Sequence, residues 1–205
     1  MKKSSCAIYK FFLFVILLCL YTSAYSQQIS QISEDDHTKI NKFLEIAETA
    51  IGQGTPQVAA TNYTKVAFIY WKHDYFRDAI DYFSQAAVIY QRVENLKNLR
   101  NVYTNIGVLY TDLQEIELSE EYFRKSLELA REIGKKEEIA SGLIDLAYIL
   151  SAMSRFDESN QKLEEAYQIA EQIGNNQLLL SCYGLFAENY RNMNQPEKAS
   201  EYRNK

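Results

Sequence analysis

The sequence has few of the residues that interrupt helices. Only 2 of its 205 residues are proline and 7 are glycine, so we expect helices joined by short turns. Histidine occurs only at His37 and His73. Neither has a second histidine or a cysteine four residues away, so we expect no metal site. Both are predicted to be solvated, His73 in a turn between helices and His37 ahead of the first helix.

The usual catalytic motifs are also missing. The sequence contains no glycine-rich phosphate loop, no nucleophile elbow and no paired-histidine motif. An active site needs a convergent set of titratable groups, and the chain has little from which to build one. We therefore expect no enzyme activity and no cofactor.

Long apolar runs are scarce, and one lies near the N-terminus. It extends from Phe11 to Tyr21, about half of the roughly 20 residues that cross a bilayer. Lysines precede it and small residues follow it, an order typical of a secretory signal peptide. We predict cleavage near Ser26, leaving Gln27 first, export to the periplasm or medium, and no membrane span in the mature chain. An uncleaved anchor and a lipoprotein signal at Cys19 are the alternatives.

Basic residues are outnumbered by acidic ones. Loss of residues 1–26 would leave 19 basic and 27 acidic residues, so we expect no binding to nucleic acid. A protein or peptide partner would be neutral to basic. Cys182 would be the one remaining cysteine and could form no internal disulfide. We predict that it is buried in an apolar helix face, with a reactive thiol as the alternative.

Small residues recur every 40 positions, each followed three residues later by a ring or a leucine. They are Ala67, Gly107, Ala147 and Ala187. A column of large side chains keeps the same spacing: Tyr63, Tyr103, Leu143 and Tyr183. Within a unit, the apolar positions fall at relative spacings of about 0, 3, 4 and 7, which form one stripe of an α-helix. A second stripe follows, so each unit is predicted to be two amphipathic helices.

The turns and the small column give local predictions. Asp74, Ser154 and Asn194 occupy matching positions between the two helices and are expected to cap the second helix. Gln114 is the exception. The second helices of two units are predicted to end in left-handed glycines, Gly134 and Gly174. In the small column, Gly107 is predicted to mark a close approach of two helices, so that Gly107→Leu would overpack the interface.

The order of a large ring, a small residue, a tyrosine and then Ala, Phe and Ala resembles the tetratricopeptide repeat. The resemblance implies an all-α solenoid of stacked antiparallel helix pairs. Residues 27–59 would form a leader and a lone N-terminal helix. The four units would be 60–99, 100–139, 140–179 and 180–205, the last with a short second helix. The 40-residue spacing resembles a long-helix subclass found in bacterial regulators and peptide-pheromone receptors.

The resemblance also implies a concave groove lined by the first helix of each unit. The candidate binding residues are Thr64, Phe68, Trp71, Lys72, Asn105, Val108, Tyr148 and Arg191. Phe68 and Trp71 could anchor a partner, or they could pack on the preceding helix at 38–50. Some relatives hold a C-terminal carboxylate with Lys and Asn in this groove. Only Asn105 matches that arrangement, and Asp145 stands where a basic residue is expected, so we predict no such clamp.

These observations predict an exported protein–protein or peptide interaction module. It could be the sensory part of a bacterial envelope signalling system. The alternative is a structural adaptor in envelope assembly, which would use its convex face.

Overall fold

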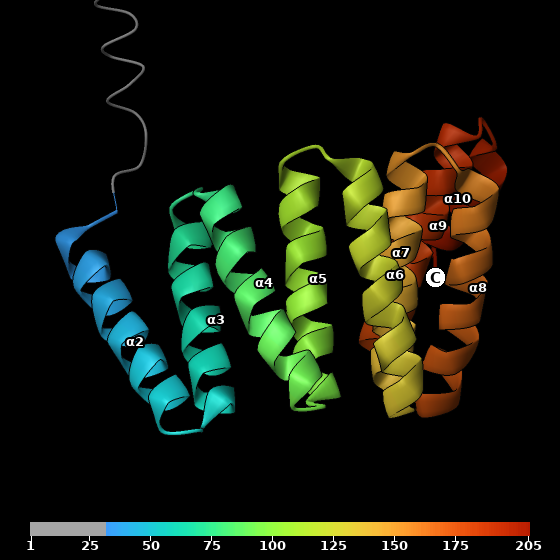
Figure 1. Cartoon of the computed structure of the whole chain (residues 1–205). Coiled ribbons are helices and arrows are strands. Elements are labelled where there is room, and N and C mark those ends of the chain that lie inside the picture. The colour runs from blue at the N-terminus through green and yellow to red at the C-terminus, as the bar shows by residue number, and fades with distance from the viewer. Residues whose placement is uncertain (1–31) are drawn as a thin grey trace, which may run out of the picture.

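The computed structural model describes residues 32–205, and this part of the chain is built of helices without strands (Figure 1). The helices are α2 (Glu34–Gly52), α3 (Pro56–Lys72), α4 (Phe76–Arg92), α5 (Leu96–Asp112), α6 (Ile116–Ile133), α7 (Lys136–Ala152), α8 (Phe156–Ile173), α9 (Asn176–Asn192) and α10 (Pro196–Arg203). The predicted signal peptide lies outside the described residues.

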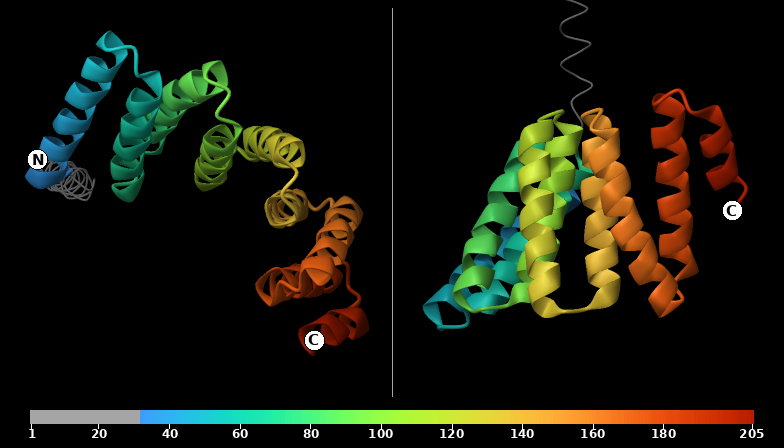
Figure 2. Two further views of the ribbon diagram at one scale, coloured as in Figure 1. Left: turned by 90° about the horizontal axis from the view of Figure 1, so that it is seen from below. Right: turned by 90° about the vertical axis from the view of Figure 1, so that its right-hand side faces the viewer.

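Each helix packs beside the next in an antiparallel series, which makes an all-α solenoid, as predicted (Figure 1). Seen along the helices, the series follows an arc, with α3, α5, α7 and α9 on its inner side and α4, α6 and α8 on its outer side (Figure 2). The inner helices begin at residues 56, 96, 136 and 176, four residues before the predicted unit boundaries. Helix α2 stands ahead of the first pair, and α10 is short.

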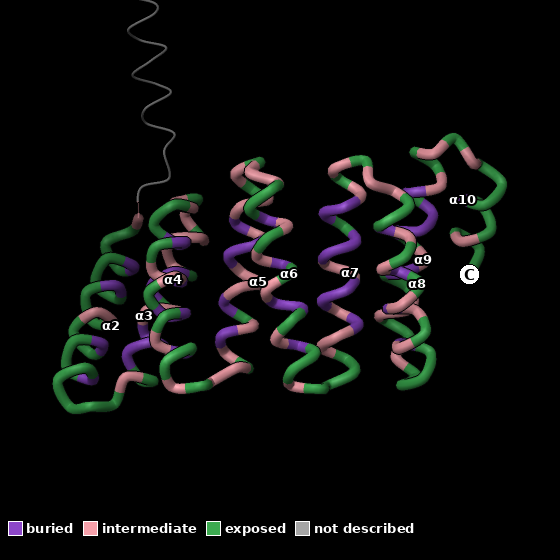
Figure 3. Tube along the Cα trace, turned by 45° about the vertical axis from the view of Figure 1, so that its right-hand side comes forward, coloured by how far each residue is buried: buried purple, intermediate pink, exposed green. Residues whose placement is uncertain are grey.

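The 40-residue register places equivalent residues in equivalent buried positions. Val66, Ile106, Leu146 and Phe186 occupy one column and are at most 3% exposed. Buried residues therefore form stripes along the helices (Figure 3). Because each helix buries its stripe against its neighbours, the core runs along the whole array. Cys182 is fully buried in this core, as predicted, and burial raises the pKa of its thiol to about 11.

The turn residues do not cap the following helix, so this prediction is wrong. Asp74, Ser154 and Asn194 have φ values of 62°, 60° and 57°, in the left-handed region, and Gln114 shares this conformation at 60°. They end the preceding helix in a Schellman turn. In the first unit, for example, the amide of Tyr75 donates to the carbonyl of Tyr70 at 3.0 Å.

The turns after the second helices use the same conformation. Gly134 and Gly174 have φ values of 77° and 67°, which confirms the predicted left-handed ends. Glu94 occupies the equivalent position after α4, with φ 53°. A residue other than glycine is strained there because its Cβ approaches the backbone. The left-handed residue recurs every 20 positions, at Gly54, Asp74, Glu94, Gln114, Gly134, Ser154, Gly174 and Asn194.

The small column marks the close approach of paired helices. A Cβ added to Gly107 would lie 3.3 Å from three ring carbons of Phe123 on α6. The buried hydroxyl of Ser119 on α6 donates to the carbonyl of Gly107 at 2.9 Å. Ser159 makes the equivalent bond to Ala147 in the next unit, at 2.7 Å. The position of Gly107 in the fold therefore agrees with the sequence prediction.

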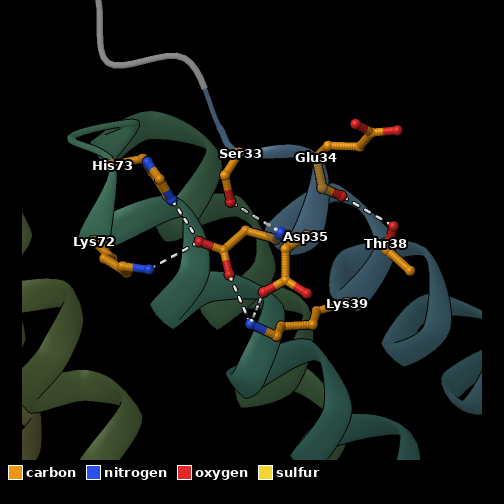
Figure 4. A network of polar contacts seen from close by, with 8 residues as sticks. Ser33, Glu34, Asp35, Thr38, Lys39, Lys72 and His73 are labelled. Atoms are coloured by element: carbon orange, nitrogen blue, oxygen red, sulfur yellow. Dashed lines mark hydrogen bonds and ion pairs between the residues drawn. The ribbon is translucent and has the colours of Figure 1, made fainter.

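Asp36 at the start of α2 joins this helix to the end of α3. The residue is 4% exposed, and one carboxylate oxygen accepts hydrogen bonds from Lys72 Nζ and His73 Nε2, both at 2.8 Å. Figure 4 shows Lys72 and His73 pointing towards the first turn of α2, and Lys39 of the next turn donates to the other carboxylate oxygen of Asp36 at 3.2 Å. These donors, Lys72 above all, hold the pKa of Asp36 well below its ordinary value.

The prediction that His73 is solvated is therefore wrong. Its side chain is 13% exposed, and its partner lies 37 residues earlier in the sequence. Motif spacing cannot reveal such a contact because folding, not the local sequence, brings α2 against α3. His37 is exposed, but it lies within α2 rather than ahead of it.

Candidate binding groove

The inner helices carry two adjoining cavities. The first, here the polar cavity, has a volume of about 420 Å³ and lies between α3, α5 and α7. Phe68 is its large apolar side chain from α3 and is 46% exposed. Most of the other lining residues carry hydroxyl, amide or charged groups: Thr64, Tyr90, Asn98, Arg100, Asn101, Thr104, Asn105, Ser141 and Asp145.

The second, here the apolar cavity, is also about 420 Å³ and lies between α5, α7 and α9, with Phe123 of α6 at its back. Its apolar walls are Val108, Ile144, Tyr148 and Leu185. Tyr148 is 53% exposed and presents a ring to the groove. The acidic side chains on its lining are Asp112, Asp145 and Glu188, and no lysine or arginine lines it.

The apolar cavity exists because two rings of the first unit are replaced by small side chains in the second. Phe68 and Trp71 in α3 pack edge-on against Phe83 of α4, with ring centroids 5.2 and 6.3 Å away. Forty residues later, Val108 and Thr111 stand in place of these rings, and both line the cavity. Space that the first unit fills with its own side chains is therefore open in the second.

Asp145 of α7 lines both cavities. Its carboxylate has no hydrogen bond or ion pair with any residue in the described part of the chain. Desolvation raises the pKa of Asp145 from 3.8 to about 6, and the charge of Arg100 opposes this shift. The groove therefore contains one carboxylate that faces both cavities and has no partner within residues 32–205.

The guanidinium of Arg100 is held by other groups. Its Nε lies 3.2 Å from Glu138 Oε2, with both side chains about 15% exposed, and one of its NH groups donates to Asn101 at 2.8 Å. Of these groups, Arg100 and Asn101 of α5 line the polar cavity, whereas Glu138 at the start of α7 does not. Arg100 therefore attracts Asp145 through space without donating a hydrogen bond to it.

The structure distributes the sequence-predicted residues along the arc. Thr64, Phe68 and Asn105 line the polar cavity, and Val108 and Tyr148 line the apolar cavity. These five predicted residues are thereby brought together on one continuous surface.

The other three predicted residues lie elsewhere. Arg191 lines a third cavity, between α9 and α10, and its guanidinium is 3.9 Å from Glu188. Trp71 is half-buried and packs on the core of the first unit, and its aromatic contacts are with Phe68 and Phe83. Lys72 contacts Asp36 of α2. Neither Trp71 nor Lys72 lines the two adjoining cavities.

Sequence reasoning missed Arg100, Leu185 and the central place of Asp145. Asp145 was predicted only as a mismatch to a carboxylate clamp. A signal was available, because an acid next to the buried Leu146 and one residue after Ile144 interrupts an otherwise apolar stretch of helix.

Two functional features are absent from residues 32–205. No group of three or more His, Cys, Asp or Glu side chains in this range could hold a metal ion. None of the helices described combines the length and apolar character that crossing a membrane requires.

Comparison with known proteins gives a consistent result. The family model described as "Tetratricopeptide repeat" matches residues 57–136 and 138–205. The structure is similar to that of BtubC (BKLC) from P. vanneervenii, with a TM-score of 0.68 and 18% identity, over 83% of this chain and 71% of that one. A comparison with curated protein sequences finds no match.

Two further solved structures share the fold. Aspartyl phosphate phosphatase F from Bacillus subtilis is similar with a TM-score of 0.67 and 17% identity, over 82% of this chain and 46% of that one. A Rap protein complexed with Competence and Sporulation Factor is similar with a TM-score of 0.58 and 18% identity, over 80% of this chain and 52% of that one. At these identities the likeness shows the arrangement of helices.

Proposed function

Because this chain belongs to the tetratricopeptide repeat family, whose stacked repeats create extended concave binding surfaces, we propose that it binds a protein or peptide segment in the groove formed by α3, α5, α7 and α9. The observation that carries this proposal is the pair of adjoining cavities on the inner helices. Together they offer hydrogen-bonding groups beside apolar walls, a combination that suits a peptide chain.

Two exposed rings make the groove suitable for anchoring a partner. Phe68 and Tyr148 occupy equivalent positions in α3 and α7 and are 46% and 53% exposed. Aromatic side chains of this kind often dominate the energy of an interface. The solved complex of a Rap protein with Competence and Sporulation Factor supports the idea that a similar solenoid accommodates a ligand.

We test the groove by selecting random displayed peptides on the full-length protein. Tyr148→Ala should reduce the affinity of selected peptides on the order of tenfold or more, because it removes a ring from the binding surface. The matched control is Val88→Ala, since Val88 is 58% exposed on the outer helix α4. Circular dichroism should show unchanged helicity in both variants.

The outcomes separate the groove from the convex face. Equal peptide binding by the wild type and Tyr148→Ala would refute use of the groove. Loss of partners on charge reversal of Glu121 and Lys125, which pair on α6 at 2.6 Å, would instead favour the structural adaptor. Groove binding predicts that this reversal leaves peptide affinity unchanged.

The proposal includes export, which rests on the N-terminal sequence. A basic start, an apolar run and small residues before Gln27 favour cleavage near Ser26 and a periplasmic or secreted protein. In that compartment the array would act as the sensory part of an envelope signalling system. N-terminal sequencing of protein recovered from the expressing cells should begin at Gln27, and an intact Met1 would argue against export.

A further inference from the structure

The charged groups around the apolar cavity favour one class of ligand. Asp145 stands at the junction of the two cavities, with Asp112 of α5 and Glu188 of α9 on the same lining. Glu188 is 3.9 Å from Arg191, at the limit of an ion pair, whereas Asp145 has no hydrogen-bonding partner among residues 32–205. Arg100 and Glu138, the other charged groups nearby, pair with each other.

The walls and the acid together match an amphipathic side chain. Lysine and arginine have an apolar stem and a charged end, and the stem readily lies along apolar surface. Val108, Tyr148 and Leu185 form such a surface beside Asp145. An acidic side chain would meet three carboxylates, and a purely apolar one would cover Asp145 without providing a donor.

We propose that the apolar cavity recognises a lysine or arginine side chain of the bound peptide, with its stem on Val108, Tyr148 and Leu185 and its charged end at the Asp145 carboxylate. This inference rests on the peptide binding proposed above. It specifies the class of ligand: a peptide segment that carries a lysine or an arginine. The acidic lining, and above all the Asp145 carboxylate without a protein partner, supply the charge complementarity.

The test is selection of the same displayed random peptides on the full-length protein and on Asp145→Asn. Peptides selected by the wild type should be enriched in lysine or arginine, and replacing that residue by glutamine should weaken binding on the order of tenfold. Asp145→Asn should bind the basic peptide and its glutamine variant with equal affinity. The control Asp81→Asn, which removes an exposed acid from the outer helix α4, should keep the wild-type difference in affinity.

Acidification provides a second measurement. As the pH falls below about 6, protonation of Asp145 should reduce the difference in affinity between a basic peptide and its glutamine variant. The same acidification should have little effect on Asp145→Asn. Repeating the titration on Asp112→Asn and Asp81→Asn separates Asp145 from the other acids, because both of these variants should keep the wild-type pH dependence.

The failures of the two proposals are distinguishable. The selected peptides could depend on Tyr148 but contain no basic residue, or Asp145→Asn could keep the preference for lysine or arginine. Either result would show that the groove binds peptides but that the apolar cavity does not recognise a basic side chain. If no selected peptide depends on Tyr148, both proposals fail.

Discussion

Substitution of Gly107 tests the close packing on which the solenoid depends. The Cβ of an alanine there would lie 3.3 Å from the Phe123 ring, so the ring must move by a few tenths of an ångström. Against this, alanine gains about 1 kcal/mol of helix propensity over glycine. The equivalent Ala67 and Phe83 of the first unit coexist fully buried. We therefore expect Gly107→Ala to change the free energy of unfolding by less than about 1 kcal/mol.

Gly107→Leu should behave differently. Leucine gains nearly as much helix propensity as alanine, but its three additional carbons point into the ring of Phe123, which is 4% exposed. Overpacking of a core costs about 1 to 3 kcal/mol, and displacing a buried ring adds about 2 kcal/mol. Subtracting the propensity gain leaves a net loss of about 2 to 4 kcal/mol. Urea denaturation followed by circular dichroism measures it.

Two controls identify the cause of the loss. Gly184→Leu adds the same side chain on α9, where a Cβ would meet no atom within 4 Å, so it should not destabilise the protein. Phe123→Ala makes room for the new side chain, and the double variant should therefore lose less stability than the two single losses added together. A Gly107→Leu protein as stable as the wild type would show that the packing argument is wrong.

Three further predictions concern single residues. Glu94→Gly should raise the free energy of unfolding by about 1 kcal/mol, because φ 53° favours glycine; an unchanged melting temperature would contradict this. The raised pKa of Asp145, about 6 against 3.8, means that its ionisation destabilises the fold as the pH rises from about 4 to 6. Asp145→Asn should thus be more stable at pH 7 by at most about 3 kcal/mol, and urea titrations should show this gain vanishing near pH 4. Asp36 has a lowered pKa, so its ionised form stabilises the fold above about pH 4, and this stabilisation is lost as the pH falls. Asp36→Asn should speed hydrogen exchange in α2 at neutral pH, whereas Asp35→Asn, an exposed neighbour, should not.

The sequence predicts the scaffold well because the scaffold repeats. Each packing position occurs once in every unit. A misleading residue in one unit can therefore be recognised by comparison with the equivalent residues of the others. The left-handed conformation at Gly134 and Gly174 follows from glycine itself. At Asp74 and Ser154 the same conformation is adopted by residues that also favour helix N-caps. Residue type alone therefore could not distinguish the end of one helix from the start of the next.

Contacts between distant segments were harder to predict. The pairing of His73 with Asp36 depends on how α2 lies against α3, and neither residue type recurs 40 positions later, where Leu113 and Phe76 stand. Trp71 was predicted on the groove because its position in the repeat lies there. In the structure its ring is half-buried against Phe83, since a large aromatic group fills the space available to it.

The groove is the part of the molecule where the units differ. A position that packs helices together is constrained by its neighbours, and the column from Val66 to Phe186 stays apolar in every unit. A position facing the groove has no such requirement, and Phe68 is accordingly replaced by Val108 in the next unit. At Asp145 the difference lowers stability, because desolvation raises the pKa of this carboxyl to about 6 and its ionisation at neutral pH therefore destabilises the fold. A residue that costs stability at the junction of two cavities is better explained by binding than by folding. The irregularities that weaken the repeat pattern are therefore the positions at which the ligand should be sought.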